Sequence, residues 1–419
     1  MKKRTFFSVG VLTLSRVAVR AAGLLYKLLL SSRLSPVSLG LYQMAMNLCG
    51  FFMTPAVSGL PKATARLTGK YGKDSGSMTA AALRLGLTVS GVSALTLLLL
   101  RNVLAKLYLR APDAGGLLTA LAPAILFGGA SAVLAAYLTA RDQAGKAALS
   151  EITEQAVKIG TAFLLFALIP SGETAALPAW AVSVGAAASL ILLLAFCCPL
   201  PAPDHRNEVI RNAWPPTVTR CVTALTHLAN TSLLPTALMA YGLTREAALG
   251  QYGILTGMTY PVVFLPLTVT GALSTVLLPR VAAGQNDPRG LKPLVRRSFL
   301  AAAGLSAGFC VLLLLFGPAL ARHVFHQPLA GRYMILLLPS VLLSGVRQVS
   351  ATVLSGLGRQ KTLMILNIAD GLFGILLTVL LVFPFGMTGF LLANGVQDLA
   401  AFLLTFGFAR RTMKKEEAV

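Results

Sequence analysis

The sequence is poor in charge, and it is poorest in acidic residues. Only 12% of its 419 residues are charged and 56% are hydrophobic, whereas about 25% are charged in an ordinary soluble domain. A mean hydropathy of +0.75 and so few charges exclude a soluble globular enzyme. The 14 acidic against 36 basic residues give a net charge of +22. Because the basic residues lie between long apolar runs, we do not expect nucleic-acid binding.

The motifs of common enzymatic chemistry are also absent. The sequence has no P-loop, no nucleotide-binding glycine fingerprint, no Ser-His-Asp order and no H-E-x-x-H zinc motif. Its five cysteines lie in or beside apolar stretches and form no C-x-x-C pair, so we expect small buried residues and no disulfide framework. We therefore expect no enzymatic activity, no metal site and no cofactor apart from a coupling Na⁺ or H⁺.

Long apolar runs fill the chain instead. A transmembrane helix needs ~20 apolar residues to cross ~30 Å of hydrocarbon. Stretches of this kind lie at 6–31, 39–60, 78–108, 115–140, 147–170, 175–198, 211–240, 247–278, 294–317, 331–356, 362–383 and 386–409. The pattern predicts an all-α polytopic membrane protein with about twelve transmembrane helices.

The loops between these stretches differ strongly in basic residues. With the N-terminus placed inside, most loop lysines and arginines fall on the cytoplasmic side, for example in the N-terminal run Lys2-Lys3-Arg4 and around Arg296 and Lys414. The positive-inside rule therefore predicts a multi-pass plasma-membrane protein with both termini in the cytoplasm.

Short runs recur in the two halves of the chain. Leu39-Gly40-Leu41-Tyr42 opens the second apolar stretch, and Leu249-Gly250-Gln251-Tyr252 opens the eighth, which is six stretches farther along the chain. An even number of spans gives equivalent helices the same orientation, so we expect a parallel repeat with its axis along the membrane normal. The two six-helix lobes would cover 1–198 and 209–419, joined by a proline-rich cytoplasmic linker at 199–208.

Basic residues inside the spans are the first candidates for function, because a charge in lipid is expensive and usually faces a cavity or a partner. At 100° per residue, Arg20 and Lys27 lie within about 40° of Arg16 on one face of the first helix. On the seventh helix, His227 lies about 20° from Arg220. Guanidinium groups bind phosphate oxygens in pairs, so we expect a cationic cavity for a phosphorylated substrate.

Acidic and amide groups in the second half suggest an alternative role for the buried cations, which is ion pairing. They also suggest a second site, for a cation or a proton. The cations of the first and seventh helices could instead pair with carboxylates such as those of Asp370 and Asp398. Together with Asn367, these two aspartates form an oxygen-rich group that could bind a cation or carry a proton. Interhelical hydrogen bonding would use the same residues.

Two further groups are candidates for structural or gating roles. Glu154, Gln155 and Lys158 lie on one stripe of the fifth helix, where an ion pair between Glu154 and Lys158 is the simplest account. Pro61 and Pro261 lie in the second and eighth helices. They would either permit bending in an alternating-access cycle or hold static kinks.

Several of these segments together resemble the multidrug/oligosaccharidyl-lipid/polysaccharide (MOP) exporter superfamily, and within it the stage V sporulation protein B-like and MurJ-like lipid II flippase branch. The segments that carry the resemblance are Ser15-Arg16 with Gly23, the run 39–43, Ser58 to Ala63, Ser150 to Lys158, and Gly257 to Arg280. The resemblance implies two six-helix lobes around a central cavity that opens alternately to each side.

The resemblance also implies a substrate and residue roles. Members of this branch move polyprenyl-diphosphate-linked sugars to the outer leaflet, with first-helix arginines facing the diphosphate, a role that would fall to Arg16 and Arg20. Some members hold sodium in the region that matches Asn367 and Asp370, but no acidic residue stands on the seventh helix here. The implied partners are a lipid-linked oligosaccharide, membrane lipids and cell-envelope synthesis enzymes.

Three functions follow from these observations. The first is a flippase of lipid II or another lipid-linked oligosaccharide for cell-wall or polysaccharide biosynthesis, with the spore cortex as one destination. The second is a cation-coupled multidrug exporter of the same fold, for which acidic and aromatic residues would suit cationic drugs better than buried bases do. The third is a non-transporting membrane scaffold that recruits cell-envelope enzymes.

Overall fold

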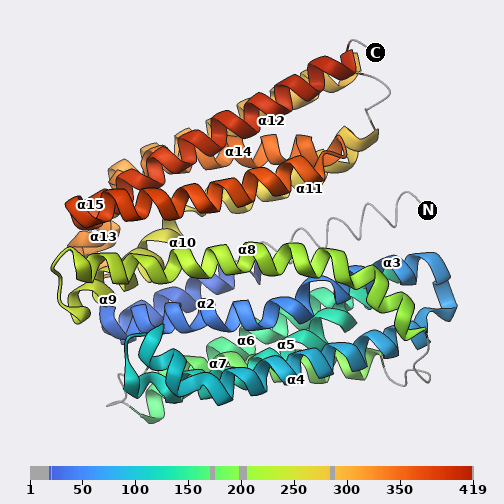
Figure 1. Ribbon diagram of the computed structural model, residues 1–419, viewed down its shortest axis with the longest axis horizontal. Helices are drawn as coiled ribbons and strands as arrows, with labels where there is room; N and C mark the ends of the chain where they lie inside the picture. Colours follow the sequence, from blue (N-terminus) through green and yellow to red (C-terminus); the bar gives the residue numbers. More distant parts are fainter. Residues whose placement is uncertain (1–17, 20, 170–174, 198–204, 284–287, 418–419) are drawn as a thin grey trace. The chain divides into compact units, whose positions relative to one another are not determined.

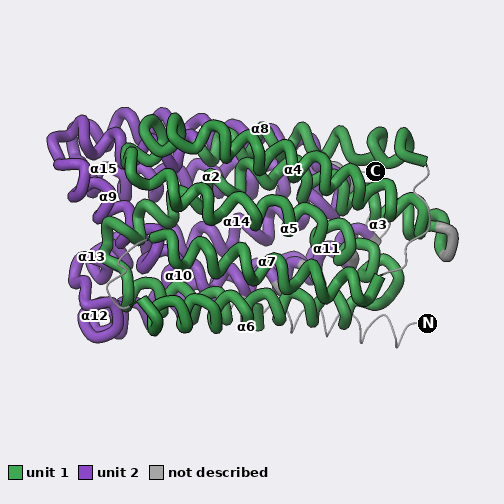
Figure 2. Tube along the Cα trace, turned by 90° about the horizontal axis from the view of Figure 1, so that it is seen from below, with its two compact units in different colours: residues 1–228 green, residues 229–419 purple. Residues whose placement is uncertain are grey.

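A computed structural model describes residues 18–19, 21–169, 175–197, 205–283 and 288–417 of the protein. Regular secondary structure in these ranges is helical throughout, without a strand, as the sequence predicts. The chain divides into two compact units, residues 1–228 and 229–419 (Figures 1 and 2). The division falls within the helix α8 (Arg206–Ala240). The expected lobes, 1–198 and 209–419, stay a prediction.

The first unit is organised around α5 (Gly115–Ala140), which packs against α2, α3, α4, α6 and α7. A helix over residues 21–33 precedes them. The bounds of its neighbours are α2 Pro36–Ser58, α3 Leu60–Tyr71, α4 Gly76–Leu107, α6 Ala144–Leu168 and α7 Ala176–Cys197, with short turns η1 Gly72–Ser75 and η2 Pro112–Ala114. Leu118, Leu121 and Ile125 of α5 are fully buried, so this helix forms the apolar centre of the unit.

The second unit is organised around α14, which packs against α11, α12 and α15. Its helices are α9 Arg245–Gly253, the π-turn η3 Ile254–Thr259, α10 Tyr260–Val263, α11 Pro266–Ala283, α12 Pro288–His323, α13 Pro328–Leu336, α14 Leu338–Gly356 and α15 Gln360–Glu417. One apolar core cluster joins Val281 of α11, Val295 of α12 and Val353 of α14.

The helices α2 and α9, which would be equivalent in the predicted repeat, begin with the same kind of N-cap. Ser35 caps α2 by accepting a hydrogen bond from the Ser38 amide at 3.3 Å, and Thr244 caps α9 by accepting one from the Ala247 amide at 3.3 Å. Both caps have extended backbone and satisfy amides that the helix itself leaves without partners. The two segments therefore begin with the same kind of cap, and their equivalence in a repeat stays a prediction.

The predicted spans correspond to helices in the described residues, but several are interrupted. The stretch 247–278 is divided into α9, η3, α10 and α11, because Pro261 and Pro266 lack the amide that a continuous helix requires. The stretch 331–356 is bent by 50° between α13 and α14. The last two stretches are separated within α15 at Gly386, whose φ of 57° suits glycine.

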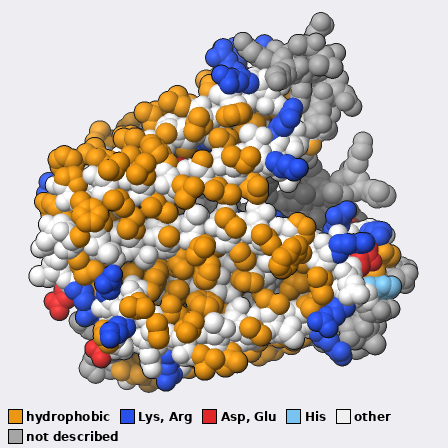
Figure 3. All heavy atoms as spheres, in the orientation of Figure 1, with side chains coloured by type: hydrophobic (Ala, Val, Ile, Leu, Met, Phe, Trp, Pro, Cys, Tyr) orange, Lys and Arg blue, Asp and Glu red, His pale blue; other side chains and the backbone are white. Residues whose placement is uncertain are grey.

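Large apolar side chains cover the outward faces of the helices, as Figure 3 shows on one side of the molecule, while lysines and arginines gather toward helix ends. Leu99 of α4 is 74% exposed and Leu315 of α12 is 64% exposed. Such exposure is costly in water but favourable in lipid. The chain is therefore a multi-pass membrane protein.

Five helices of the described residues are long and apolar enough to cross a membrane, or six if the bent pair α13 and α14 is one span. Some helices that correspond to predicted spans are more polar. Among them, α6 carries Glu151, Glu154 and Lys158 within its central turns, as a helix that faces an aqueous cavity would. The number of about twelve spans stays a prediction.

Candidate functional site

Lys158 is the centre of a polar cluster in the first unit. It lies on α6, and its Nζ donates a hydrogen bond to Gln155 Oε1 at 2.5 Å. The same Nζ lies 4.8 Å from the centroid of the Tyr26 ring, which comes from the helix over residues 21–33. The Tyr26 hydroxyl in turn donates to the Pro178 carbonyl of α7 at 2.9 Å. The cluster therefore fixes the first helix against α6 and α7.

The cluster brings two lysines close to two carboxylates, those of Glu154 and Glu151. Glu154 interacts electrostatically with Lys158 and forms a side-chain hydrogen bond with Ser189 of α7. Lys27, which the sequence places on the cationic face of the first helix, is half-buried and near enough to Lys158 to repel it. The cluster therefore combines two lysines with two carboxylates.

α6 and α7 approach closely at this cluster because Gly185 has no side chain. A Cβ at this position would lie 2.8 Å from the Glu154 carbonyl oxygen and 3.0 Å from Lys158 Cβ. The sequence shows the stripe of Glu154, Gln155 and Lys158, but its spacing cannot show that Lys27 and Tyr26 come to meet it, because those contacts depend on how the helices pack.

The remaining residues of the predicted cationic cavity are less completely described. Arg16 and Arg20 lie outside the described residues. Arg220 and His227 lie on α8, and both side chains are exposed. Their spacing of seven residues in one continuous helix places them on the same side of α8, as the sequence predicts.

A second polar cluster, here called the Arg347 cluster, joins α14 to α15 in the second unit. Nη2 of Arg347 lies 2.6 Å from Asp370 Oδ2, and its Nη1 lies 3.7 Å from Asp398 Oδ1. Gln397 Nε2 donates to both Oδ1 and the backbone carbonyl of Asp370, each at 3.1 Å. One guanidinium group is thus shared between two carboxylates.

The Arg347 cluster borders a cavity of about 350 Å³. Besides Arg347 and Asp370, the cavity wall is mainly apolar, with Phe373 and Leu404 among its side chains. Most polar groups in this region therefore bind one another.

The three residues of the predicted oxygen-rich group do not all come together. Asp370 and Asp398 come together, whereas Asn367 lies one turn before Asp370 with an exposed side chain. Arg347 lies within the apolar stretch 331–356, but its position in the sequence does not assign it to these aspartates. No group of three or more His, Cys, Asp or Glu side chains in the described ranges is arranged to hold a metal ion.

The two candidate gating prolines both follow a helix interruption. Pro61 is the second residue of α3, directly after the break between α2 and α3 at Gly59. Pro261 is the second residue of α10, directly after the π-turn η3. At the second site, the Thr259 hydroxyl donates to the Ile254 carbonyl at 3.1 Å, which satisfies an acceptor of the widened turn.

Comparison with known sequences gives two family matches and a curated relative. A family described as "Polysaccharide biosynthesis protein" matches residues 7–285, and a family described as "MatE" matches residues 224–380. The chain is 25% identical over 372 residues to stage V sporulation protein B of Bacillus subtilis (strain 168). The aligned region covers 82% of this chain and 71% of the relative.

Comparison with solved structures shows the fold. A multidrug resistance MATE family transporter of the MOP superfamily, in its inward-facing conformation, has a TM-score of 0.77 at 15% identity, over 97% of this chain and 99% of that chain. A MOP superfamily transporter from Pyrococcus furiosus has a TM-score of 0.73 at 13% identity. The match covers 98% of this chain and 96% of that chain. The predicted all-α polytopic fold and the resemblance to the MOP superfamily are confirmed.

Proposed function

Because this chain belongs to the family of polysaccharide biosynthesis proteins, we propose that it is a flippase and not an enzyme. It moves a polyprenyl-diphosphate-linked saccharide from the inner to the outer leaflet by alternating access, for cell-wall or polysaccharide biosynthesis. The observation that carries this proposal is the combination of the family match over residues 7–285 with similarity to stage V sporulation protein B. The sporulation role in the name of that relative favours the spore cortex among the destinations.

In this proposal, the basic residues bind the diphosphate of the substrate. Arg16 and Arg20 provide paired guanidinium donors, Lys27 adds a charge farther along the first helix, and Arg220 and His227 contribute from α8. Guanidinium groups remain protonated throughout the transport cycle and bind phosphate oxygens in a bidentate manner. Lys27 and Lys158 lie near enough to repel each other, and this supports an anionic ligand beside them.

The Arg347 cluster is the proposed coupling site. Two carboxylates share one guanidinium group, which leaves a net negative charge when both aspartates are ionised. A proton or Na⁺ at Asp370 or Asp398, with Asn367 as a further oxygen ligand, would remove that charge. Because neutralisation weakens the pairing with Arg347, it provides a means to alter the packing of α14 on α15.

The residues of the Lys158 cluster and the two prolines serve the conformational change. Glu154, Gln155 and Lys158 hold the first helix through Tyr26, so a ligand that draws Lys27 or Lys158 away would loosen this contact. Pro61 and Pro261 provide weak points at which helices can bend, because each lies beside a break in helical hydrogen bonding.

A cation-coupled multidrug exporter is the second candidate. The MatE match over residues 224–380 favours it. However, a cationic drug would be repelled by the same bases that attract a diphosphate, and the chain has only two tryptophans for cation–π contacts. These charges make the flippase the better proposal.

The deciding experiment measures binding of a polyprenyl-diphosphate-linked disaccharide to the purified protein by native mass spectrometry. Wild type is compared with Arg16→Ala/Arg20→Ala and with the control Arg322→Ala/Arg332→Ala, which removes two exposed bases from α12 and α13. We expect tight binding by wild type and control, and a loss of about tenfold or more in the first-helix variant.

A leaflet-translocation assay in proteoliposomes then tests transport itself. Loss of both binding and translocation in Arg16→Ala/Arg20→Ala, with the control unaffected, would support the flippase. If binding is absent or insensitive to the substitutions, while a cationic drug is bound and exported, the multidrug exporter becomes the better assignment.

A further inference from the structure

A basic pocket lies at one end of the first unit, where α3 ends and α8 begins. Its volume is about 640 Å³. It is called here the Lys70 pocket, and it is lined by Lys70, Tyr71, His205, Arg206, Asn207, Glu208 and Arg211. None of these residues belongs to the proposed substrate, coupling or gating groups.

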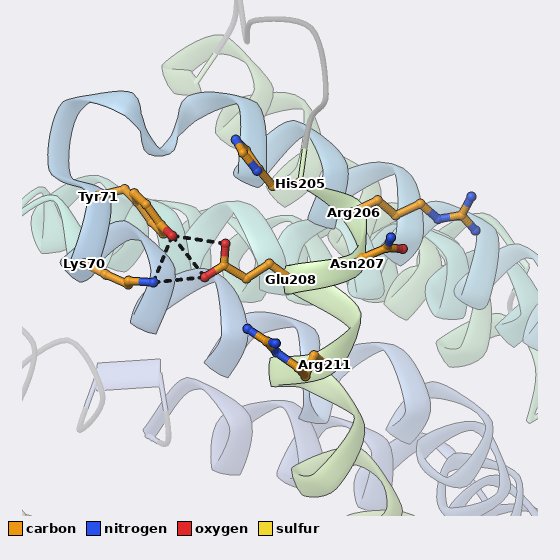
Figure 4. A pocket seen from close by; sticks show the side chains of 7 residues that line it. All are labelled: Lys70, Tyr71, His205, Arg206, Asn207, Glu208 and Arg211. Carbon is orange, nitrogen blue, oxygen red and sulfur yellow. Dashed lines mark hydrogen bonds and ion pairs between the residues drawn. The ribbon is translucent and has the colours of Figure 1, made fainter.

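Hydrogen bonds hold the centre of the Lys70 pocket in place (Figure 4). Lys70 Nζ lies 3.1 Å from Glu208 Oε1 and donates to the Tyr71 hydroxyl at 2.8 Å. The Tyr71 hydroxyl lies 3.1 Å from both carboxylate oxygens of Glu208. Below this centre, core residues such as Leu67 of α3 and Val209 of α8 pack in one buried cluster, so the two helices form a rigid wall.

The Lys70 pocket carries an excess of positive charge. Lys70, Arg206 and Arg211 contribute three cations, and Glu208 contributes the one carboxylate that lines it. The hydrogen bond from Lys70 lowers the pKa of Glu208, and the hydrogen bonds that Lys70 donates to Tyr71 and Glu208 raise the pKa of Lys70, so both remain charged at neutral pH. Two positive charges are therefore left for an external anion.

The side chains in Figure 4 differ in direction. Lys70, Tyr71 and Glu208 converge, and Arg211 extends toward Glu208 from the next turn of α8, whereas Arg206 points away along the rim. Glu208 is close enough to Arg211 for the guanidinium group to favour its ionised form. A ligand in the pocket would thus contact Lys70 and Arg211, with Arg206 free to fold over it.

Membrane topology alone would also place bases in this region, and part of the charge has that explanation. Lys62 and Arg66 are exposed on α3 and do not line the Lys70 pocket. The Lys70 pocket differs because its bases surround a hollow, and because the first turn of the 35-residue helix α8 adds the positive end of its dipole. These features together are typical of phosphate sites.

We propose that the Lys70 pocket binds the phosphate group of an anionic molecule, which is either the headgroup of an acidic phospholipid or a free phosphate. This site is independent of the proposed transport function, since it uses none of the same residues. It would add a point at which the anionic surface of the membrane, or a soluble phosphate compound, holds α3 against α8.

The test uses the full-length protein in a neutral detergent. Binding of phosphatidylglycerol is measured by native mass spectrometry for wild type, for Arg206→Gln/Arg211→Gln, and for the control Arg322→Gln/Arg332→Gln, which makes the same change in charge at exposed positions of the second unit. We expect affinity to fall by about tenfold or more in Arg206→Gln/Arg211→Gln and to change little in the control. Melting temperatures verify that each variant is folded.

Glu208→Gln provides a test that cannot be mimicked by misfolding. This change removes the carboxylate that competes with the ligand and keeps an oxygen acceptor for Lys70, so we expect tighter binding of the anion. Inorganic phosphate as a competitor separates the two sources. Displacement of the lipid at millimolar phosphate supports a site for free phosphate, and its absence supports a lipid headgroup. Equal affinity in all four proteins would overturn the proposal.

Discussion

At the scale of single residues, Arg347 is the cation that pairs with two carboxylates of the second unit. Its guanidinium group contacts Asp370 at 2.6 Å and Asp398 at 3.7 Å, and the three side chains are only 15% to 24% exposed. Taking away the cation would leave two carboxylates close together in a medium of low polarity. Such groups are costly when they have no partner, even where the intact ion pair adds little.

We therefore expect Arg347→Gln to lower the free energy of unfolding by about 2 kcal/mol, which is the typical value of a lost hydrogen bond to a charged group. Thermal unfolding in detergent measures the effect. Arg347→Lys should fall between wild type and Arg347→Gln, because it keeps the charge but not the two-pronged geometry. Arg347→Gln/Asp370→Asn should recover part of the loss, and a failure to recover would show that the carboxylates are not the cause.

The ion pair between Lys70 and Glu208 makes a prediction about pH. The pKa of Glu208 is lowered in the folded protein by its hydrogen bond from Lys70. Its contribution to stability is therefore present above its ordinary pKa of 4.5 and is lost as pH falls through the lower, folded value. Glu208→Gln should be slightly less stable than wild type at pH 7.

The difference should shrink as pH falls below 4.5 and vanish below the folded pKa, because the wild-type carboxyl is then protonated as well. Melting temperatures of the two proteins between pH 3 and pH 7 measure this convergence. A difference that stays constant over the whole range would mean that the carboxylate charge has no part in the contact.

The residues of the candidate sites could be found from the sequence, but their partners could not. A base or acid inside an apolar stretch is conspicuous, which is how Lys27, Lys158 and Asp370 were selected. Which helices meet is decided by packing, so the proximity of Lys27 to Lys158 and the sharing of Arg347 between two aspartates are visible only in the structure.

At the scale of elements, Gly59 determines how closely α3 can approach α8. A Cβ at this position would lie 2.1 Å from the backbone oxygen of Ala213 and would also overlap the Thr217 hydroxyl. A side chain can rotate away from such an overlap, but the backbone of a packed helix cannot. The glycine is therefore required by the close approach, because its own φ of −90° is accessible to any residue.

We expect Gly59→Ala to destabilise the protein by about 1–3 kcal/mol, the usual cost of overpacking. Gly69→Ala is the matched control, within the helix α3 that Gly59 precedes, since no atom lies within 4 Å of its added Cβ. That variant should be neutral or more stable by up to about 1 kcal/mol, because alanine favours helix. Thermal unfolding of both variants measures the difference, and equal melting temperatures would contradict the close approach.

The positions of helices were predictable from apolar length, but their interruptions were only partly so. Proline marked the broken region around Pro261 and Pro266, since it lacks an amide donor. The π-turn at 254–259 had no such signal, because Gly257 and the threonines around it fit a regular helix equally well. The break at Gly386 was foreseen as a gap between two apolar stretches, and its positive φ explains why glycine is there.

At the scale of the whole molecule, the fold class followed from composition, whereas the direction of insertion depends on the distribution of basic loops. Hydropathy is a sum over many residues and tolerates local errors, so it identifies a membrane protein securely. The positive-inside rule counts far fewer residues. The cytoplasmic location of both termini therefore stays a prediction. The side of the membrane on which the Lys70 pocket lies depends on the same prediction.

The two ends of α5 provide the most direct test of orientation. Asp113 lies just before this helix and Gly145 shortly after it, and both are exposed. The helix has 26 residues, which is about 39 Å at 1.5 Å per residue and therefore enough to cross the bilayer. A membrane-impermeant maleimide should then label a cysteine at only one of the two positions in intact cells.

We expect Asp113→Cys to be labelled from outside and Gly145→Cys to be labelled only after permeabilisation, in a protein whose five native cysteines are replaced by serine. Added Cβ atoms at Gly145 meet nothing within 4 Å, so this substitution should not disturb the fold. The cysteine-free protein controls for background. The reverse labelling pattern would invert the topology, place the Lys70 pocket on the outer side and remove the cytoplasmic leaflet as the starting point of transport. Labelling of both positions from outside would mean that α5 does not span the membrane.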